Sequence, residues 1–291
     1  MINIAEIKQK KSIQELLEFG IINIDKSSGP SSFNISDFVR KKLGLRKTSH
    51  FGTLDPKVTG VLPIALNRAC KLTGFFIGED KEYVGIMRIH EDVNLDKIKK
   101  AIKKEFLGKI KQTPPVKSRV KRQERQREIK KFEILEKEGK DILFQVECQG
   151  GTYIRKLIDD LGKTLGIGAH MLELRRVRAG IFLEDSKDYP SVNLYDFEKT
   201  VDEYKYGNEK LLRAMIIPGE RIQELHQVVQ IKEDNLKKIL TGKPIYKKDL
   251  IKKSNLKQGE IISIFCREKL IGIYQVIDND HVFAKAKFVL N

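Results

Sequence analysis

Hydrophobic and polar positions change their period several times along the chain, and each period predicts a type of element. Apolar runs and alternating patterns predict strands at 20–24, 60–66 and 81–90, and a hairpin at 130–151. Apolar residues at helical spacing predict helices at 31–44, 93–108 and 152–168. The first helix has a capping serine at its start, Ser31 or Ser32, and Gly44 where a glycine commonly ends a helix.

The pattern changes after Pro190, where the chain becomes polar with helical stretches. From Glu224 onward, a short helix is followed by a hairpin and a final strand. Short strands joined by tight turns are typical of a small β-barrel. Residues 1–15 are polar, so we expect an N-terminal extension there. The predicted organisation is an extension at 1–15, a main domain at 16–223 and a small barrel at 224–291.

A basic segment, residues 112–131, interrupts these patterns and is called the basic arm below. It opens with two prolines and has almost no apolar residues, so it predicts a loop outside the core. Its cations favour contact with a phosphate backbone, although a solvated run of charge has the same composition. They are Lys117, Arg119, Lys121, Arg122, Arg125, Arg127, Lys130 and Lys131.

The overall charge points to the same kind of partner. Of 291 residues, 56 are Lys or Arg and 40 are Asp or Glu, which gives a net charge of +16. Such a charge favours a polyanionic partner, for which nucleic acid is the default. A lysine-rich composition without a partner is the alternative, and the clustering of cations in the basic arm weakens it.

No sequence pattern predicts a metal site, a disulfide or a membrane span. The three cysteines form no C-x-x-C pair, and the five histidines form no H-x-x-x-H pattern. No apolar run reaches the length of a membrane-spanning helix. We therefore expect no metal, no cofactor, no membrane association and a reducing compartment, the cytoplasm.

One carboxylate lies in an unusual loop, "HFGTLDPKVTG", residues 50–60. The proline after Asp55 restricts that residue to an extended backbone, and Gly52 and Gly60 permit tight bends and close approach of another molecule. An aspartate before proline is also a common turn former. The stiffness of the loop favours a second interpretation, in which Asp55 is a nucleophile or base held in a fixed position.

Such a carboxylate needs a partner cation, and "GGTYIRKL" offers Arg155 at the start of a helix that follows a strand. Its planar guanidinium suits a carboxylate, and pairing in a dry pocket would keep Asp55 ionised. A surface ion pair of little energetic weight is the alternative. Tyr83 either packs in the core or stacks on an unstacked base. His50 either contacts a phosphate or caps a turn.

Four stretches together resemble the TruB family of RNA pseudouridine synthases, and within it the dyskerin-type branch that acts in archaeal and eukaryotic H/ACA guide-RNA particles. They are "INIDKSSGPSS", "HFGTLDPKVTGVLPIAL", "KEYVGIMRIH" and "GGTYIRKLIDDLGKTLGIGAHMLELRRVRAG". The resemblance runs from about residue 20 to the end of the chain. It implies an α+β fold with a mixed, mainly antiparallel central sheet and flanking helices, followed by a PUA domain, an RNA-binding β-barrel.

The resemblance also implies roles for individual residues. Asp55 falls on the catalytic aspartate, Arg155 on the arginine that pairs with it, and Tyr83 on the tyrosine that stacks on the flipped uracil. The residues that match substrate-binding positions of the family are His50, Leu174, Lys26, Lys121 and Arg122. Lys121 and Arg122 belong to the basic arm, which matches the thumb that closes over RNA. Lys26 and Gly29 fall in a loop that supports the active-site loop.

The implied function is isomerisation of uridine to pseudouridine in rRNA, tRNA or both, as the catalytic subunit of an H/ACA particle. The implied partners are substrate RNA, a guide RNA, small accessory proteins and a kink-turn-binding protein. The implied location is cytoplasmic, or nucleolar in a eukaryote. The alternatives are a stand-alone tRNA pseudouridine synthase and a catalytically silent RNA-binding scaffold, and the combination of Asp55, Tyr83 and Arg155 argues against the scaffold.

Overall fold

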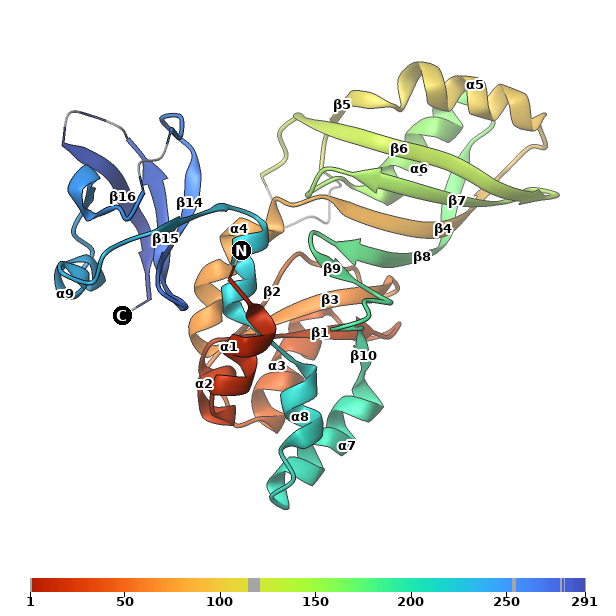
Figure 1. The fold of residues 1–291 in the computed structure, drawn as a ribbon. Helices are drawn as coiled ribbons and strands as arrows, with labels where there is room; N and C mark the ends of the chain where they lie inside the picture. The colour runs from red at the N-terminus through yellow and green to blue at the C-terminus, as the bar shows by residue number, and fades with distance from the viewer. Residues whose placement is uncertain (1, 115–120, 253–254, 278, 280, 291) are drawn as a thin grey trace. The chain divides into compact units, whose positions relative to one another are not determined.

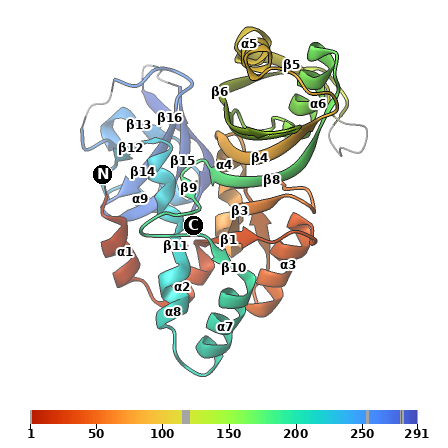
Figure 2. The same cartoon turned by 90° about the vertical axis from the view of Figure 1, so that its right-hand side faces the viewer.

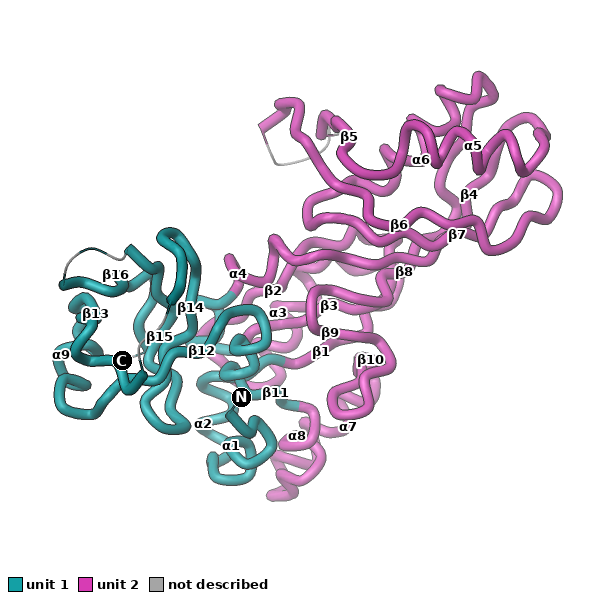
Figure 3. Tube along the Cα trace, turned by 45° about the horizontal axis from the view of Figure 1, so that its top comes forward, with its two compact units in different colours: residues 1–21, 66–72, 216–291 teal, residues 22–65, 73–215 magenta. Residues whose placement is uncertain are grey.

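The computed structural model describes residues 2–114, 121–252, 255–277, 279 and 281–290. The chain forms two compact units, coloured separately in Figure 3. The larger unit comprises residues 22–65 and 73–215, and the smaller unit comprises residues 1–21, 66–72 and 216–291. The smaller unit combines both ends of the chain, so the two units differ from the three consecutive segments that the sequence predicts. The division into a catalytic domain at 16–223 and an RNA-binding domain at 224–291 stays a prediction.

The larger unit is built on a mixed sheet, with strands in the order β10-β1-β3-β8-β4-β7-β6-β5 (Figure 1). Strand β3 runs parallel to β8, whereas the neighbours of β4, β6 and β7 are all antiparallel. The main strands are β1 (Gly20–Lys26), β3 (Thr59–Leu66), β4 (Lys81–Ile89), β5 (Gly108–Gln112), β6 (Arg125–Glu138), β7 (Asp141–Cys148) and β8 (Ala169–Ala179). Shorter strands are β2 (Thr48–His50) beside β3, β9 (Phe182–Leu183) beside β8, and β10 (Val192–Asn193).

Helices flank this sheet, which confirms the expected α+β class. Helices α5 and α6 contact each other and strands β6 and β8, and both views show them on one face of the sheet (Figures 1 and 2). The helices of this unit are α3 (Ser32–Lys42), α4 (Thr73–Ile77), α5 (Leu95–Glu105), α6 (Ile154–Leu165), α7 (Leu194–Lys205) and α8 (Lys210–Met215). The predicted helices at 31–44, 93–108 and 152–168 correspond to α3, α5 and α6.

The start of α3 matters most for the site described below. The Ser31 hydroxyl accepts the backbone N–H of Asn34, and the Asn34 side chain accepts the N–H of Ser31, so the two residues form a capping box. Gly44 follows the last turn with a φ of +63°, a conformation that glycine adopts at little cost. The face formed by Ser32, Ile35, Ser36 and Val39 is buried.

The smaller unit contains a second, curled sheet in the order β12-β14-β15-β16-β13. Its strands are β12 (Gln227–Gln230), β13 (Ile245–Tyr246), β14 (Ile261–Cys266), β15 (Lys269–Val276) and β16 (Val282–Val289), with helix α9 (Leu236–Leu240). Apolar side chains of these strands and of α9 form one core. The hairpin and final strand predicted from the sequence are β14, β15 and β16, and the sheet fits the expected PUA-like domain.

The N-terminal residues are more ordered than a polar extension. They form α1 (Ile4–Lys10) and α2 (Ile13–Glu18), because a few apolar side chains such as Ile7 and Leu16 are buried against the rest of the smaller unit. Lys10 forms an ion pair with Glu268 at 2.8 Å, in the turn between β14 and β15. The N-terminal segment therefore contacts the C-terminal module.

The structure corrects two sequence-based expectations in the larger unit. Residues 125–131 of the basic arm belong to β6, where Ile129 is buried, so this part is not a loop. It pairs with β5 and β7, and charged side chains at alternate positions concealed the strand pattern. Lys117 and Arg119 lie outside the described residues. Strand β8 was not expected, because its arginines interrupt the apolar alternation.

Candidate active site

Asp55 lies in the loop between β2 and β3, and backbone atoms on both sides of it are held in place. The Ser32 hydroxyl, at the start of α3, accepts the N–H of Leu54 at 2.8 Å and donates to its carbonyl at 2.9 Å. The N–H of Gly29 donates to the carbonyl of Pro56 at 2.9 Å, and the N–H of Val58 to that of Asp55 at 3.0 Å. The loop that carries the carboxylate is therefore fixed by the end of β1 and the start of α3.

Lys26 completes this support from beneath the loop. Its ammonium is fully buried and donates to the carbonyls of Ser27, Pro56 and Val58 at 2.8 to 2.9 Å. Burial lowers the pKa of Lys26, while the nearby charge of Asp55 raises it. Because its three donors are all directed at backbone carbonyls, the geometry favours a supporting role for Lys26 over direct contact with RNA.

The opposite side of the site is the turn that leads into α6. Gly151 has a φ of +84°, and a Cβ at Gly150 would lie 2.5 Å from the carbonyl oxygen of Ile77, so neither position tolerates a side chain without strain. The buried side chain of Gln112 holds the next residues, since it accepts the N–H of Tyr153 at 3.0 Å and donates to its carbonyl at 3.2 Å. Helix α6 then begins, and Arg155 is its second residue.

These two supports bring Asp55 and Arg155 together. The Arg155 Nη2 lies 2.7 Å from the Asp55 Oδ2, within the range of a charge-assisted hydrogen bond. The side chain of Arg155 is 61% exposed and that of Asp55 is 49% exposed. The pair predicted from the sequence therefore exists, but it lies in the open and not in a dry pocket.

Tyr83 lies next to a buried arginine that sequence reasoning missed. Tyr83 on β4 is directly opposite Arg176 on β8, and the charge of Arg176 acts on the Tyr83 side chain. Arg176 also donates to the carbonyl of Val61 at 2.8 Å and to that of Gly52, in the Asp55 loop, at 3.1 Å. Both side chains are buried, and burial raises the pKa of Tyr83 and lowers that of Arg176.

The signal for Arg176 was the sequence "LRRVRAG", in which adjacent arginines must point to opposite faces of a strand. The neighbouring Arg175 does face the other way and pairs with Asp25 and Glu184. Without the strand assignment, the sequence could not tell which arginine is inside. The structure shows that Arg176 joins the Asp55 loop to the strand that carries Tyr83.

Two further predicted residues lie near this arginine. His50 ends β2, and burial lowers the pKa of its imidazole, with a smaller contribution from the charge of Arg176. The imidazole is therefore neutral at pH 7. Leu174 lies two residues before Arg176 on β8, opposite Gly85, and is buried. The alternation of a strand places Leu174 and Arg176 on the same face.

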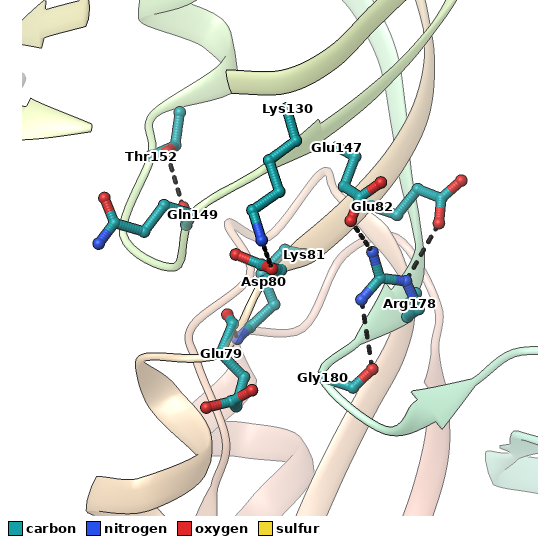
Figure 4. A network of polar contacts seen from close by, with 10 residues as sticks. All are labelled: Glu79, Asp80, Lys81, Glu82, Lys130, Glu147, Gln149, Thr152, Arg178 and Gly180. Atoms are coloured by element: carbon teal, nitrogen blue, oxygen red, sulfur yellow. Dashed lines mark hydrogen bonds and ion pairs between the residues drawn. The ribbon is translucent and has the colours of Figure 1, made fainter. Parts of the chain in front are cut away.

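A network of charged residues holds the beginning of β4 against its neighbours (Figure 4). Arg178 on β8 pairs with Glu82 at 3.1 Å and with Glu147 at 2.7 Å, so it links β4, β7 and β8. Lys130 on β6 pairs with Asp80, just before β4. These contacts join four strands at the end of the sheet where β4 carries Tyr83.

Lys81 adds a buried contact beside the same network. Its ammonium donates to the carbonyls of Phe76, Ile77 and Glu79, at the end of α4 and in the turn that follows. Burial lowers the pKa of Lys81 to about 8. Like Lys26, Lys81 is buried and donates to backbone carbonyls, so it is not placed to contact a ligand.

Further charged residues lie on the basic arm and on helix α6. In the basic arm, Lys121 and Arg122 are exposed, and Arg127 on β6 lies against Gly151, three residues before α6 begins. On α6, Asp159 pairs with Lys163, and the half-buried Asp160 pairs with Lys156. These two aspartates form ion pairs within the helix and do not face a common point.

No group of three or more His, Cys, Asp or Glu side chains suitable for a metal ion is found among the described residues. Cys70, Cys148 and Cys266, which all lie in the described ranges, form no disulfide. In the part of the chain that the structure describes, no helix is both long and apolar enough to cross a membrane.

Comparison with known proteins gives consistent matches over most of the chain. Residues 40–154 match the TruB family pseudouridylate synthase N-terminal domain, and residues 155–224 match the tRNA pseudouridylate synthase B C-terminal domain. A relative from Methanocaldococcus jannaschii, named "Probable tRNA pseudouridine synthase B", is 41% identical over 261 residues, covering 88% of this chain and 75% of the relative.

Two solved structures share the whole fold. One is a chain of a Cbf5–Nop10–Gar1 complex, with a TM-score of 0.88 and 36% identity, covering 97% of this chain and 88% of that chain. The other belongs to an H/ACA RNP bound to a substrate RNA containing 2′-deoxyuridine, with a TM-score of 0.87 and 34% identity, covering 98% of this chain and 89% of that chain.

The fold, the sheet of the smaller unit and these matches define the class of protein as an RNA pseudouridine synthase, an isomerase of uridine. The chain belongs to the TruB family, and its solved structural relatives include Cbf5-containing complexes.

Proposed function

We propose that the pair of Asp55 and Arg155, with Tyr83 beside it, is the catalytic centre for converting uridine to pseudouridine in RNA. The observation that carries this proposal is the 2.7 Å contact between Asp55 and Arg155, made by two segments about 100 residues apart in the sequence. Both segments are held by hydrogen bonds between side chains and their backbone groups, so the pair is preorganised before substrate binds.

The reaction breaks the bond between C1′ and N1, turns the uracil and forms a bond between C1′ and C5. The proton on C5 leaves and N1 gains a proton, so no redox cofactor or energy source is needed. Asp55 acts either by attacking the nucleotide or by removing the 2′ proton to give a glycal, and its ionised, oriented carboxylate suits both routes. Arg155 holds that carboxylate in one orientation through the contact between Nη2 and Oδ2.

The base must leave its stack to reach Asp55. Tyr83 then provides an aromatic surface for the extruded uracil, Leu174 an apolar wall and His50 a neutral polar contact. The alternating positions of β8 and the pairing of Tyr83 with Arg176 support this arrangement. Lys26 and Gly29 keep the Asp55 loop in position and do not contact the nucleotide.

We further propose that the chain acts as the catalytic subunit of an H/ACA guide-RNA particle in the cytoplasm. The similarity over nearly the whole chain to a subunit of a Cbf5–Nop10–Gar1 complex supports this proposal. The partners are then substrate RNA, a guide RNA, small accessory proteins and a kink-turn-binding protein. The curled sheet of the smaller unit is the PUA-like module that grips the guide RNA.

The test measures pseudouridine formation in one labelled RNA by the full chain, alone and with guide RNA and the accessory proteins. We expect little product from the chain alone and efficient conversion of the guide-paired uridine. Equal yields with and without guide would contradict guide dependence. Absence of product in every combination would contradict the catalytic assignment itself.

A stand-alone tRNA pseudouridine synthase is the second candidate. The name of the M. jannaschii relative, "Probable tRNA pseudouridine synthase B", favours it. Efficient modification of an isolated tRNA, without a guide, is the result that this alternative requires. The same catalytic residues serve both candidates, because they differ only in how the target uridine is selected.

The basic arm supplies a prediction about salt dependence. We expect the double variant Lys121→Gln, Arg122→Gln to bind RNA more weakly, because two exposed cations next to β6 are lost. The slope of log affinity against log salt should fall in magnitude by about 0.7 to 0.9 for each phosphate contact removed. Filter binding or anisotropy at several salt concentrations measures it.

The matched control is the double variant Lys99→Gln, Lys100→Gln, which removes two exposed cations from α5. Its salt slope should equal that of the wild type. If both double variants change the slope equally, the basic arm contributes only general charge.

A further inference from the structure

Phe33 is the most exposed phenylalanine of the chain. Its exposed fraction is 72%, and it is the one phenylalanine among the exposed large hydrophobic residues in the described ranges. All 14 phenylalanines lie within those ranges. Unlike an exposed tyrosine, the ring has no polar group that water can solvate, so its position in the first turn of α3 is not explained by packing or hydrogen bonding.

The location of Phe33 relates it to Asp55. The preceding residue, Ser32, is hydrogen bonded through its hydroxyl to both the N–H and the carbonyl of Leu54, the residue before Asp55. Adjacent Cα atoms are about 3.8 Å apart. The backbone of Phe33 therefore begins within one residue of the contact that fixes the Asp55 loop.

The helical geometry also defines the direction in which Phe33 projects from α3. Successive residues turn by about 100°, so Phe33 lies about 60° from Ser36 and well away from Phe38. Ser36 bonds to Thr48 of β2 at 2.9 Å, whereas Phe38 packs against Phe197 of α7. Phe33 is thus exposed on the same side of α3 as Ser36, which contacts β2, and away from the side that packs against α7.

We propose that Phe33 stacks on an unpaired base of the RNA that flanks the target uridine, and so helps to keep that segment open while the uridine is extruded. The inference rests on the proposed function, because it takes Asp55 as the place of the uridine. Aromatic rings bind bases of any sequence through their faces, and extruding one nucleotide unstacks its neighbours. The positive net charge of the chain favours RNA over an apolar partner at this exposed ring.

A single tryptophan can report this contact, because the chain contains none. The variant Phe33→Trp is titrated with a single-stranded oligoribonucleotide that carries one central uridine, and with the same strand lacking the base on one side of that uridine. We expect the intact strand to quench the tryptophan emission, and the strand with the flanking abasic site to quench it less. The variant Tyr206→Trp, at an exposed position on the surface after α7, is the control and should not respond.

A second measurement uses removal of the ring. Phe33→Leu keeps an apolar, helix-compatible side chain at an exposed position, so folding should not change. Loss of one stacked base should weaken binding of the strand about 5- to 150-fold and raise KM with kcat little changed, while Phe33→Tyr should behave like the wild type.

Three results would overturn the inference. They are unchanged emission of the Phe33→Trp variant when anisotropy shows that RNA is bound, equal quenching of the Phe33→Trp and Tyr206→Trp variants, and wild-type affinity of Phe33→Leu. The binding measurements do not need turnover, so they distinguish failure of this inference from failure of the proposed catalytic role of Asp55, which is tested by activity alone.

Discussion

An Asp55→Asn variant is expected to fold, to bind RNA and to form almost no pseudouridine. The amide has nearly the same shape as the carboxylate but is neither nucleophilic nor basic, so the chemical step should slow by about 10⁴-fold. The backbone contacts that fix the loop do not involve the carboxylate, so the loop should keep its conformation. Product is measured by release of label from C5 of uridine under single-turnover conditions.

Asp159→Asn provides a matched control. Asp159 also forms an exposed ion pair, with Lys163 at 2.7 Å, and its side chain is 44% exposed against 49% for Asp55. It should retain wild-type activity, since an exposed pair on a helix contributes little to stability. If folded Asp55→Asn turned over at a rate near that of Asp159→Asn, Asp55 would not be the catalytic residue.

The second large effect is expected for Arg176→Met. The thioether fills part of the space but leaves the carbonyls of Val61 and Gly52 without their donor, at a cost of about 1–3 kcal/mol for each buried group. The free energy of unfolding of the larger unit should therefore fall by several kcal/mol. Chemical denaturation followed by circular dichroism measures this change.

Arg176→Lys separates catalysis from stability, because lysine keeps the charge but lacks the planar fork that donates to the two carbonyls opposite Tyr83. We expect kcat to fall by about 10²-fold, more than any change in KM, since the loop and Tyr83 lose their common support. Arg175→Lys, on the opposite face, is the control and should leave kcat nearly unchanged. A wild-type kcat for Arg176→Lys would show that Arg176 serves only the fold.

The site could be predicted from the sequence where its residues lie in local motifs. Asp55 is constrained by Pro56 and two glycines, and Arg155 follows a pair of glycines that mark the turn before α6. These constraints are local in the sequence and can be recognised without knowing the fold. That the two side chains meet followed from the family resemblance and from chemistry, and the structure supplies the 2.7 Å contact.

Arg176 could not be predicted in the same way. Its role depends on cross-strand pairing with Tyr83 and on contact with Gly52, which is 124 residues away in the sequence. A charged residue in the middle of a segment also argues against a buried strand, so β8 itself was missed. The same reason explains residues 125–131, where pairing on both sides makes a strand from a strongly basic sequence. Tertiary pairing outweighs local pattern in both cases.

The openness of the Asp55–Arg155 pair has a consequence for fidelity on the proposed mechanism. Two unit charges about 4 Å apart attract each other by about 1 kcal/mol in water and by about 4 kcal/mol at the effective dielectric constant of 20 typical of pairs near a protein surface. Since both side chains are about half exposed in the free protein, only a bound RNA that covers them can exclude the water. An RNA that covers the site incompletely leaves the charges of Asp55 and Arg155 hydrated. Different target RNAs should therefore differ in kcat as well as in KM. Selectivity among uridines then depends on how completely each RNA closes the site, and not on the uracil, which is the same in all of them.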